Sequence, residues 1–239
     1  MKIIKSTTTT QPPMDVLAHC RVYPLSNFYH PSPQSITLPN TLISNTDNDK
    51  PHIGLLHLIE HDFKMSNFKK QLFNHLTTSN ASYLIIDITS TWKRFLLSSS
   101  SASASLMYMN STSILSFEGL INYLVQLNDH PTTALQRSLS INNEPLQLTL
   151  PLSGIIIDNL SYLPQDPPQF KILTNILKLL RKSLGCWIMT TSYGLEYNQG
   201  IENTISTSAS NSNTYIPLNY TKEMDIVLLH ERDLRSRIL

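Results

Sequence analysis

Glycine is scarce in this sequence, and its scarcity removes several kinds of functional site. Only six glycines occur among 239 residues, and none of them forms a G-x-G-x-x-G, G-x-x-x-x-G-K-[ST] or G-x-S-x-G pattern. These patterns let the backbone approach a phosphate closely or hold a nucleophilic serine in a tight turn. An ordinary phosphate-binding loop and the nucleophile elbow of the α/β-hydrolases are therefore excluded.

Cysteine, a strong net charge and long apolar runs are also missing. The two cysteines, Cys20 and Cys186, cannot build a zinc site or a disulfide framework, and their apolar surroundings predict reduced core thiols of an intracellular protein. The 18 basic and 17 acidic residues nearly cancel, which argues against coating nucleic acid by bulk charge. No apolar run of about 18 residues predicts a membrane span, and the N-terminus lacks the pattern of a signal peptide.

Leucine, isoleucine and uncharged polar residues are abundant instead. Leu and Ile total 59 residues, enough for a large core, whereas Ser, Thr and Asn total 70. The length fits one large domain. Residues 1–20 are expected to form a polar flexible tail, and residues 21–239 a single domain with an extended N-terminal arm that includes the apolar residues 22–28.

Buried apolar runs alternate with segments of helical periodicity, which is typical of βαβ units and a mainly parallel sheet covered by helices on both faces. The loops between them are rich in Ser, Thr and Asn, as in residues 98–105 and 204–219. The predicted strands are residues 53–59, 83–88, 106–109, 154–158, 186–191 and 224–229.

Three helices can be placed by their end signals. Ser66 and Ser116 are expected to cap helices, and the Pro167-Pro168 pair to begin a third helix that stops at Gly185. The helix after Ser116 is expected to turn an apolar face inward, formed by Leu120, Ile121, Leu124 and Val125.

Acidic residues follow three of the predicted strands, where α/β sheets carry their sites. Asp158 ends an aliphatic strand, as the magnesium-orienting acid of a nucleotide site does. The turn after the first strand, however, has no glycine and carries Glu60 and Asp62, while Lys64 stands before the helix cap. The sequence thus predicts the strand, turn and helix of a nucleotide site without the residues that would bind phosphate. Asp87 is the acidic residue at the end of the third strand considered, residues 83–88. A degenerate ATPase that uses Asp158 is the alternative.

A zinc-protease pattern competes for the same segment. His57, Glu60 and His61 fit H-x-x-E-H, which requires both histidines on one helix face together with a third ligand. Here the segment has the features of a strand, on which the two histidines would lie about 13 Å apart. A zinc hydrolase is therefore the second, less favoured enzyme hypothesis.

Basic residues gather in two places. Lys171, Lys178 and Lys182 recur on one face of the helix after Asp158, and such a stripe is either a solvated face or a surface for phosphate or a partner. Near the C-terminus three arginines alternate with acids. These residues supply six of the candidate DNA contacts: Lys171, Lys178, Lys182, Arg232, Arg235 and Arg237.

Five short blocks carry a resemblance that extends from about residue 20 to about residue 230. They are residues 22–28 (VYPLSNF), 108–111 (YMNS), 157–161 (IDNLS), 184–188 (LGCWI) and 198–204 (NQGIENT). In this order they are similar to the platinum sensitivity protein 3 family, whose members are subunits of the Shu complex of budding yeasts. The strands also resemble a RecA-like recombinase core in order and spacing.

The resemblance implies a RecA-like α/β fold with a degenerate phosphate-binding loop, and a recombinase paralogue that is not an enzyme and uses no cofactor or metal. It implies a heterodimer with a second paralogue, chromosome segregation in meiosis protein 2, together with the other Shu complex subunits. The pair would bind DNA and help the main recombinase assemble filaments during homologous recombination and error-free post-replication repair. The expected location is the nucleus, without membrane contact.

Two features agree with an inactive relative, and one departs from the family. No second acid follows Asp87, and Ser192 stands where catalytic relatives carry glutamine. The family's second DNA-binding loop carries basic residues, but no Lys or Arg occurs here between Lys182 and Lys222. From that loop only Lys222 is carried over as a candidate DNA contact.

Overall fold

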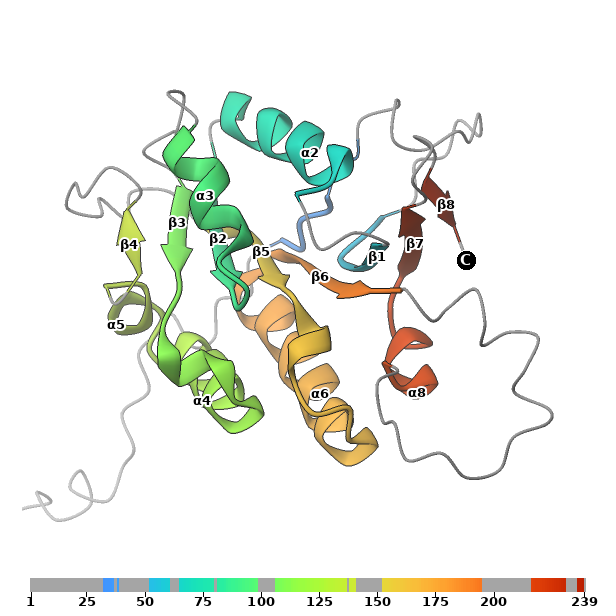
Figure 1. Ribbon diagram of the computed structural model, residues 1–239. Coiled ribbons are helices and arrows are strands. Elements are labelled where there is room, and N and C mark those ends of the chain that lie inside the picture. The colour runs from blue at the N-terminus through green and yellow to red at the C-terminus, as the bar shows by residue number, and fades with distance from the viewer. Residues whose placement is uncertain are drawn as a thin grey trace, which may run out of the picture.

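The computed structural model describes residues 32–36, 38, 52–60, 65–79, 81–98, 106–136, 138–140, 152–194, 216–230 and 236–238. Strands and helices alternate along most of the chain (Figure 1). In chain order the elements are β1 (Leu55–Glu60), α2 (Asn67–Thr78), β2 (Ser82–Asp87), α3 (Thr91–Ser98), β3 (Leu106–Met109), the 3-10 helix η2 (Thr112–Leu115), α4 (Phe117–Asp129), α5 (Pro131–Gln136), β4 (Leu139–Ser140), β5 (Leu152–Asp158), the 3-10 helix η3 (Leu160–Tyr162), α6 (Pro167–Leu184), β6 (Trp187–Tyr193), α8 (Leu218–Thr221), β7 (Ile226–His230) and β8 (Ser236–Ile238).

The described strands form one eight-stranded sheet in the order β4-β3-β2-β5-β6-β1-β7-β8. The six central strands are parallel, and the short strands β4 and β8 pair antiparallel at the two edges. The register places Asp87 of β2 beside Asp158 of β5, and Glu60 of β1 beside Tyr193 of β6. The acidic residues at the ends of these strands therefore lie on the same side of the sheet, where the carboxyl ends of the parallel strands meet.

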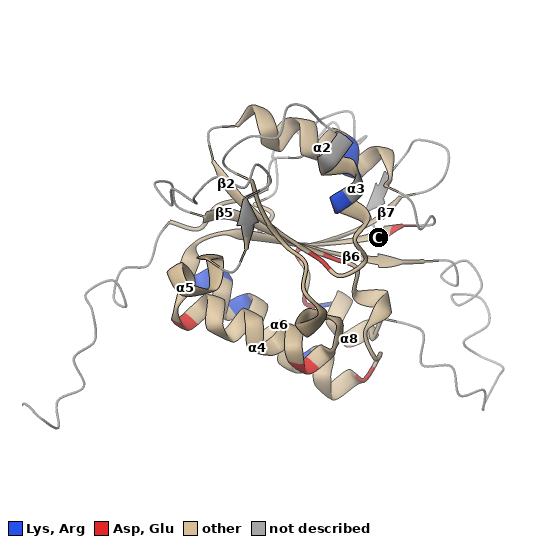
Figure 2. Ribbon diagram, turned by 60° about the vertical axis from the view of Figure 1, so that its left-hand side comes forward, with Lys and Arg blue, Asp and Glu red and all other residues tan. Residues whose placement is uncertain are grey.

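Helices cover both faces of the sheet. Helices α2 and α3 lie on one side, and α4, α5, α6 and α8 lie on the other (Figure 2). Two hydrophobic cores result, and the alternation of strand residues assigns each side chain to one of them. Along β5, Ile155 and Ile157 belong to the core under α4 and α6, whereas Ile156 belongs to the core under α2.

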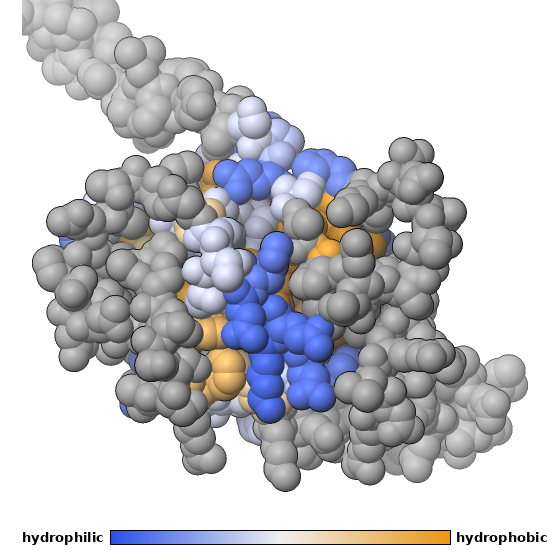
Figure 3. All heavy atoms as spheres, turned by 90° about the horizontal axis from the view of Figure 1, so that it is seen from above, coloured by the Kyte–Doolittle hydropathy of each residue, from blue (hydrophilic) through white to orange (hydrophobic). Residues whose placement is uncertain are grey.

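The outer side of the α2 layer is polar. On α2 the exposed residues include Lys70, Asn74 and His75, while Phe68 and Leu72 on its other face are fully buried. The view from above in Figure 3 shows hydrophilic side chains gathered on the described part of this side. The helix is thus amphipathic, with one face in the core and one in solvent.

The predicted architecture is confirmed. The mainly parallel α/β sheet has helices on both faces, and each of the six predicted strands is present within two residues at either end. The predicted helix ends are also confirmed. Ser66 Oγ accepts from Lys69 N at 3.2 Å, Ser116 Oγ accepts from Gly119 N at 3.0 Å, and Gly185 ends α6 with a positive φ of 68°.

Several details differ from the sequence-based expectation. Val125 is 39 % exposed, because α4 turns this position away from the sheet. The short helix α8 begins within the predicted loop 204–219, because Tyr220 packs into the core. Helices α3 and α5 and the edge strands β4 and β8 were not predicted. The N-terminal tail and arm, Cys20 and residues 99–105 lie outside the described residues.

Candidate functional site

A buried ion cluster lies at the edge where β1 and β5 end. Lys69, in the first turn of α2, places its ammonium between Glu60 and Asp158. Lys69 Nζ lies 2.8 Å from Asp158 Oδ2 and also forms an ion pair with Glu60 Oε2. The three side chains are at most 1 % exposed. Thr191 of β6 donates its hydroxyl to the other carboxylate oxygen of Asp158.

The local sequence explains why Lys69 points inward. Lys69 shares one face of α2 with Leu72, Phe73 and Leu76, which are buried at spacings of three, four and seven residues. The lysine therefore occupies an apolar position of an amphipathic helix. That placement was the sequence signal for this residue, and it was missed. Lys64, which stands before the helix cap in the sequence, lies outside the described residues.

Burial and charge oppose each other in the cluster. Burial by itself would lower the pKa of Lys69, but the carboxylates of Asp158 and Glu60 raise that pKa by more, so it lies above its ordinary value. Burial raises the pKa of Glu60, Asp158 adds to the rise, and Lys69 opposes it. Lys69 thus remains charged and compensates acids that would otherwise be isolated in the interior.

This arrangement stands where a nucleotide would bind in a sheet of this kind. Such a site needs free backbone amides at the helix start, a positive charge for the phosphates and an acid to orient magnesium. Here the acid, Asp158, is already bound to the ammonium of Lys69. An entering phosphate would meet Glu60 and Asp158 rather than an available cation. The cluster therefore compensates the charges of the acidic strand ends and does not suit a nucleotide.

Asp87, the third acidic strand end, acts as a helix cap. Its carboxylate accepts from the backbone N–H groups of Thr91, Trp92 and Lys93 at 2.9–3.1 Å, and from the Tyr108 hydroxyl at 3.0 Å. Burial, and next Asp158, raise the pKa of Asp87, while these hydrogen bonds oppose the rise. The carboxylate is occupied at the start of α3, which explains why this helix forms.

His57 lies in the middle of a strand, which removes the helix that the zinc hypothesis requires. Its Nδ1 is 2.8 Å from Thr190 Oγ1, and its Nε2 is 2.9 Å from Ser192 Oγ. Burial lowers the pKa of His57 to about 3, so the imidazole is neutral. His61 lies outside the described residues. Within the described part of the chain, no group of three or more His, Cys, Asp or Glu side chains could hold a metal ion.

Cys186 is confirmed as a core thiol. It is free and fully buried directly before β6, and burial raises its pKa to about 12. A thiol of this kind is protonated at neutral pH and is a poor nucleophile.

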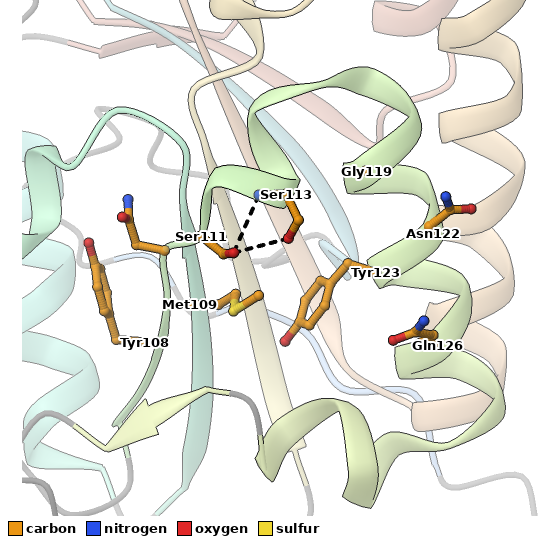
Figure 4. Close-up of a pocket in the computed structure, with 9 residues that line it drawn as sticks. Tyr108, Met109, Ser111, Ser113, Gly119, Asn122, Tyr123 and Gln126 are labelled. Carbon is orange, nitrogen blue, oxygen red and sulfur yellow. Dashed lines mark hydrogen bonds between the residues drawn. The ribbon is translucent and has the colours of Figure 1, made fainter.

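A cavity of about 470 Å³ opens beyond the end of β3 (Figure 4). Asn110, Ser111 and Ser113 line one wall, and Asn122 and Tyr123 of α4 line the other. Ser111 Oγ accepts from the backbone N–H of Ser113 at 3.3 Å and from its hydroxyl at 3.0 Å. None of the residues that line the cavity is charged, so it offers no cation for a phosphate.

The structure describes the side chains of four of the seven candidate DNA contacts. Lys171, Lys178 and Lys182 are exposed along α6, and Lys222 is exposed just after α8. Lys178 forms an ion pair with Glu223, the residue next to Lys222, so α6 and α8 bring these two candidates close together. Charges of both signs occur on this layer (Figure 2).

The three C-terminal arginines cannot be placed in the same way. Arg237 belongs to β8 and pairs with Leu229 through its backbone. Arg232 and Arg235 lie outside the described residues. As for membranes, no helix in the described ranges is sufficiently long and apolar to cross a bilayer.

Two solved structures resemble this fold at low sequence identity. One, an ATPase domain, is 11 % identical, with a TM-score of 0.44 over 75 % of this chain and 70 % of that one. The structure of a DnaB-like replicative helicase and its interactions with primase is also 11 % identical, with a TM-score of 0.44 over 75 % of this chain and 47 % of that one. The parallel strand order β3-β2-β5-β6-β1 agrees with the α/β RecA-like core predicted from the sequence.

Sequence comparison extends over almost the whole chain. Platinum sensitivity protein 3 from Saccharomyces cerevisiae is 38 % identical over 238 residues, which cover 91 % of this chain and 93 % of that protein. A family profile described as "Shu complex component Psy3, DNA-binding description" matches residues 20–233. The resemblance inferred from the short sequence blocks is therefore confirmed, and the chain belongs to the Psy3 family of Shu complex components.

Proposed function

We propose that this chain is a non-catalytic recombinase paralogue that acts within a complex. It would pair with a second paralogue, chromosome segregation in meiosis protein 2, and bind DNA as part of that pair. The complex would promote assembly of recombinase filaments in homologous recombination and error-free post-replication repair, in the nucleus. The family places the chain among Shu complex components, and the finer steps are our inference.

The observation that carries the non-catalytic part of the proposal is the position of Lys69. Its ammonium compensates Asp158, the residue that a degenerate ATPase would use for magnesium. Displacing Lys69 would leave Glu60 and Asp158 buried without a countercharge, which is costly. The chain therefore keeps the strand–helix framework of a nucleotide site while an internal ion pair takes the place of the ligand.

The role assigned to DNA follows from charge. The 18 basic and 17 acidic residues leave a net charge of +1, and Lys178 is already paired with Glu223. Few cations are then available to displace counterions from DNA. The family profile describes DNA binding, although this chain has few cations available for it. Both observations fit if a partner subunit supplies most of the phosphate contacts.

Two measurements on the full-length chain test this function. In titration calorimetry with ATP and magnesium, we expect no binding by the wild type or by the Asp158→Ala variant. Micromolar binding that Asp158→Ala abolishes would instead support a degenerate ATPase. In co-purification, we expect a stable heterodimer with the second paralogue that binds DNA more tightly than this chain alone, and separate elution of the two chains would refute the pairing.

A further inference from the structure

Helix α6 has a second apolar stripe on the side turned away from the sheet. Ile172 and Leu179 are 50 % and 49 % exposed, and Ile176 between them is partly buried. Their spacing of four and then three residues puts them on one face of the helix. The core-facing side is already filled by other residues: Phe170, Leu173, Thr174, Leu177 and Leu180. Ile172 and Leu179 therefore expose apolar surface that the core does not use.

Helix α4 continues this apolar surface. Two contacts fix how the helices lie against each other: the ring centroids of Phe117 and Phe170 are 5.6 Å apart, and Ser183 Oγ lies 2.6 Å from Asn128 Oδ1. The first contact joins the N-terminal ends of the two helices, and the second joins their C-terminal ends. Helices α4 and α6 therefore run side by side in the same direction (Figure 1).

This register places Val125 level with Leu179, and Ile121 level with Ile176. Val125 is 39 % exposed, and Ile121 packs partly against the core. We call the five residues Ile121, Val125, Ile172, Ile176 and Leu179 the α4–α6 apolar surface. A third helix can pack its apolar face against two helices that lie side by side.

Positive charge borders this surface on the α6 side. Lys171 and Lys182 are exposed on the flank of α6 that carries the lysine stripe, and neither forms an ion pair with a described residue. Lys178, between them, pairs with Glu223. A helix that covers the apolar surface would therefore find complementary charge if acidic residues lay along its edge above α6.

We propose that the α4–α6 apolar surface binds an amphipathic helix of another Shu complex subunit, whose acidic edge faces Lys171 and Lys182. This inference rests on the proposed function, because it assigns the contact through which the chain joins its complex. DNA fits the surface poorly, because duplex and single strands present phosphates to cations and offer nothing for half-exposed Ile and Leu side chains. A protein helix satisfies both the apolar stripe and its charged border.

The test uses the full-length chain co-expressed with the other Shu complex subunits. The variant Ile172→Ser/Leu179→Ser should weaken subunit association by about tenfold or more, since central apolar anchors carry most of the binding energy. Lys171→Glu/Lys182→Glu should weaken it by about three- to tenfold, and more at low salt than at high salt. The matched control is Leu115→Ser, because Leu115 is 51 % exposed on η2 and lies outside the surface.

A photo-crosslinking residue at position 179 should join this chain to an acidic amphipathic helix of another subunit, and the same residue at position 115 should not. Circular dichroism of each variant checks that the fold is kept. Assembly unchanged by Ile172→Ser/Leu179→Ser, or crosslinks to DNA or to a second copy of this chain, would overturn the inference while leaving the proposed function intact. Failure of the wild type to assemble with any subunit would overturn both.

Discussion

Lys69 brings a charged side chain to a buried position of α2 where an apolar residue is usual, and this changes which ligands the site could bind. Its neighbours on the inner face of α2 are Leu72, Phe73 and Leu76, and a leucine at position 69 would extend that face. The lysine instead brings a charge that Glu60 and Asp158 can compensate. All three groups are buried, so each loses favourable interactions with water. The attraction between their opposite charges offsets that cost.

The first prediction concerns removal of that charge. Lys69→Met should lower the free energy of unfolding at pH 7 by about 3–5 kcal/mol, because two buried carboxylates lose their countercharge. The triple variant Lys69→Met/Glu60→Gln/Asp158→Asn should recover most of the loss. Chemical denaturation measures both, with Lys70→Met on the exposed face of α2 as the control, for which we expect little change. A single variant as stable as the wild type would show that the cluster is not coupled.

The second prediction concerns His57 and pH. Burial lowers the pKa of His57 to about 3, below the ordinary value of 6.5, so the unfolded state binds more protons between these pH values. Stability should therefore fall as the pH is lowered from 6.5 towards 3, by up to about 1.4 kcal/mol per pH unit from this residue. His57→Gln should show a shallower loss in thermal unfolding across that range. His75→Gln, at an exposed position of α2, should keep the wild-type slope.

The candidate site was only partly predictable from the sequence. The positions of Glu60, Asp87 and Asp158 at strand ends follow from local pattern, because parallel strands put their carboxyl ends at one edge. The pairing of Lys69 with Asp158 does not, since it joins residues 89 apart in the chain. The capping role of Asp87 does not follow from local pattern either, because Thr89, Ser90 and Thr91 are also cap-forming residue types and lie closer to the start of α3.

Close contact between neighbouring strands is the main constraint at the scale of elements. Gly154 of β5 lies under the ring of Trp187 on β6, and a Cβ atom at position 154 would be 2.2 Å from Trp187 Cε2. Trp187 is buried and stacks near Tyr83 of β2, with ring centroids 5.7 Å apart. The ring is therefore buried with Gly154 and Tyr83 as neighbours, and a Cβ atom at position 154 would have to displace it.

The third prediction follows from that contact. Gly154→Ala should lower the free energy of unfolding by about 1–3 kcal/mol, because an added methyl group overpacks a filled core. Gly54→Ala is the matched control, since its Cβ would meet the guanidinium of Arg181, which can swing towards solvent. That variant loses the Arg181–Asp225 ion pair and should cost less, about 1 kcal/mol or below. Equal thermal shifts for the two variants would contradict this account.

Elements with strong local patterns were predicted, and those fixed by long-range contacts were not. Most residues of each of the six central strands are apolar, and the caps at Ser66, Ser116 and Gly185 are local signals. Strand β4 has two residues and exists only through its pairing with β3, and β8 likewise depends on β7. Helix α8 is a single turn that the burial of Tyr220 holds in place.

At the scale of the whole molecule, a net charge of +1 governs the fourth prediction. Each phosphate that a protein neutralises steepens the salt dependence of binding, so the isolated chain should bind DNA weakly and with a shallow salt slope. Charge reversal at Lys222, Arg235 and Arg237 should weaken binding by the heterodimer only a few-fold. Fluorescence anisotropy across a salt series measures both quantities. Tight binding by the isolated chain, unaffected by these changes and by reversal of Lys171, Lys178 and Lys182, would refute the assignment of DNA contacts.

The ammonium of Lys69 belongs to the polypeptide itself, and this has a consequence for timing. A bound nucleotide dissociates, is replaced and changes with the energy charge of the cell, so a protein that depends on one cycles between states. A tethered cation has no dissociation rate into bulk solvent, and its local concentration never varies. The charges of Glu60 and Asp158 are therefore compensated without a ligand that binds and dissociates. If an assembly that contains this chain switches between states with nucleotide exchange, another component must bind the nucleotide.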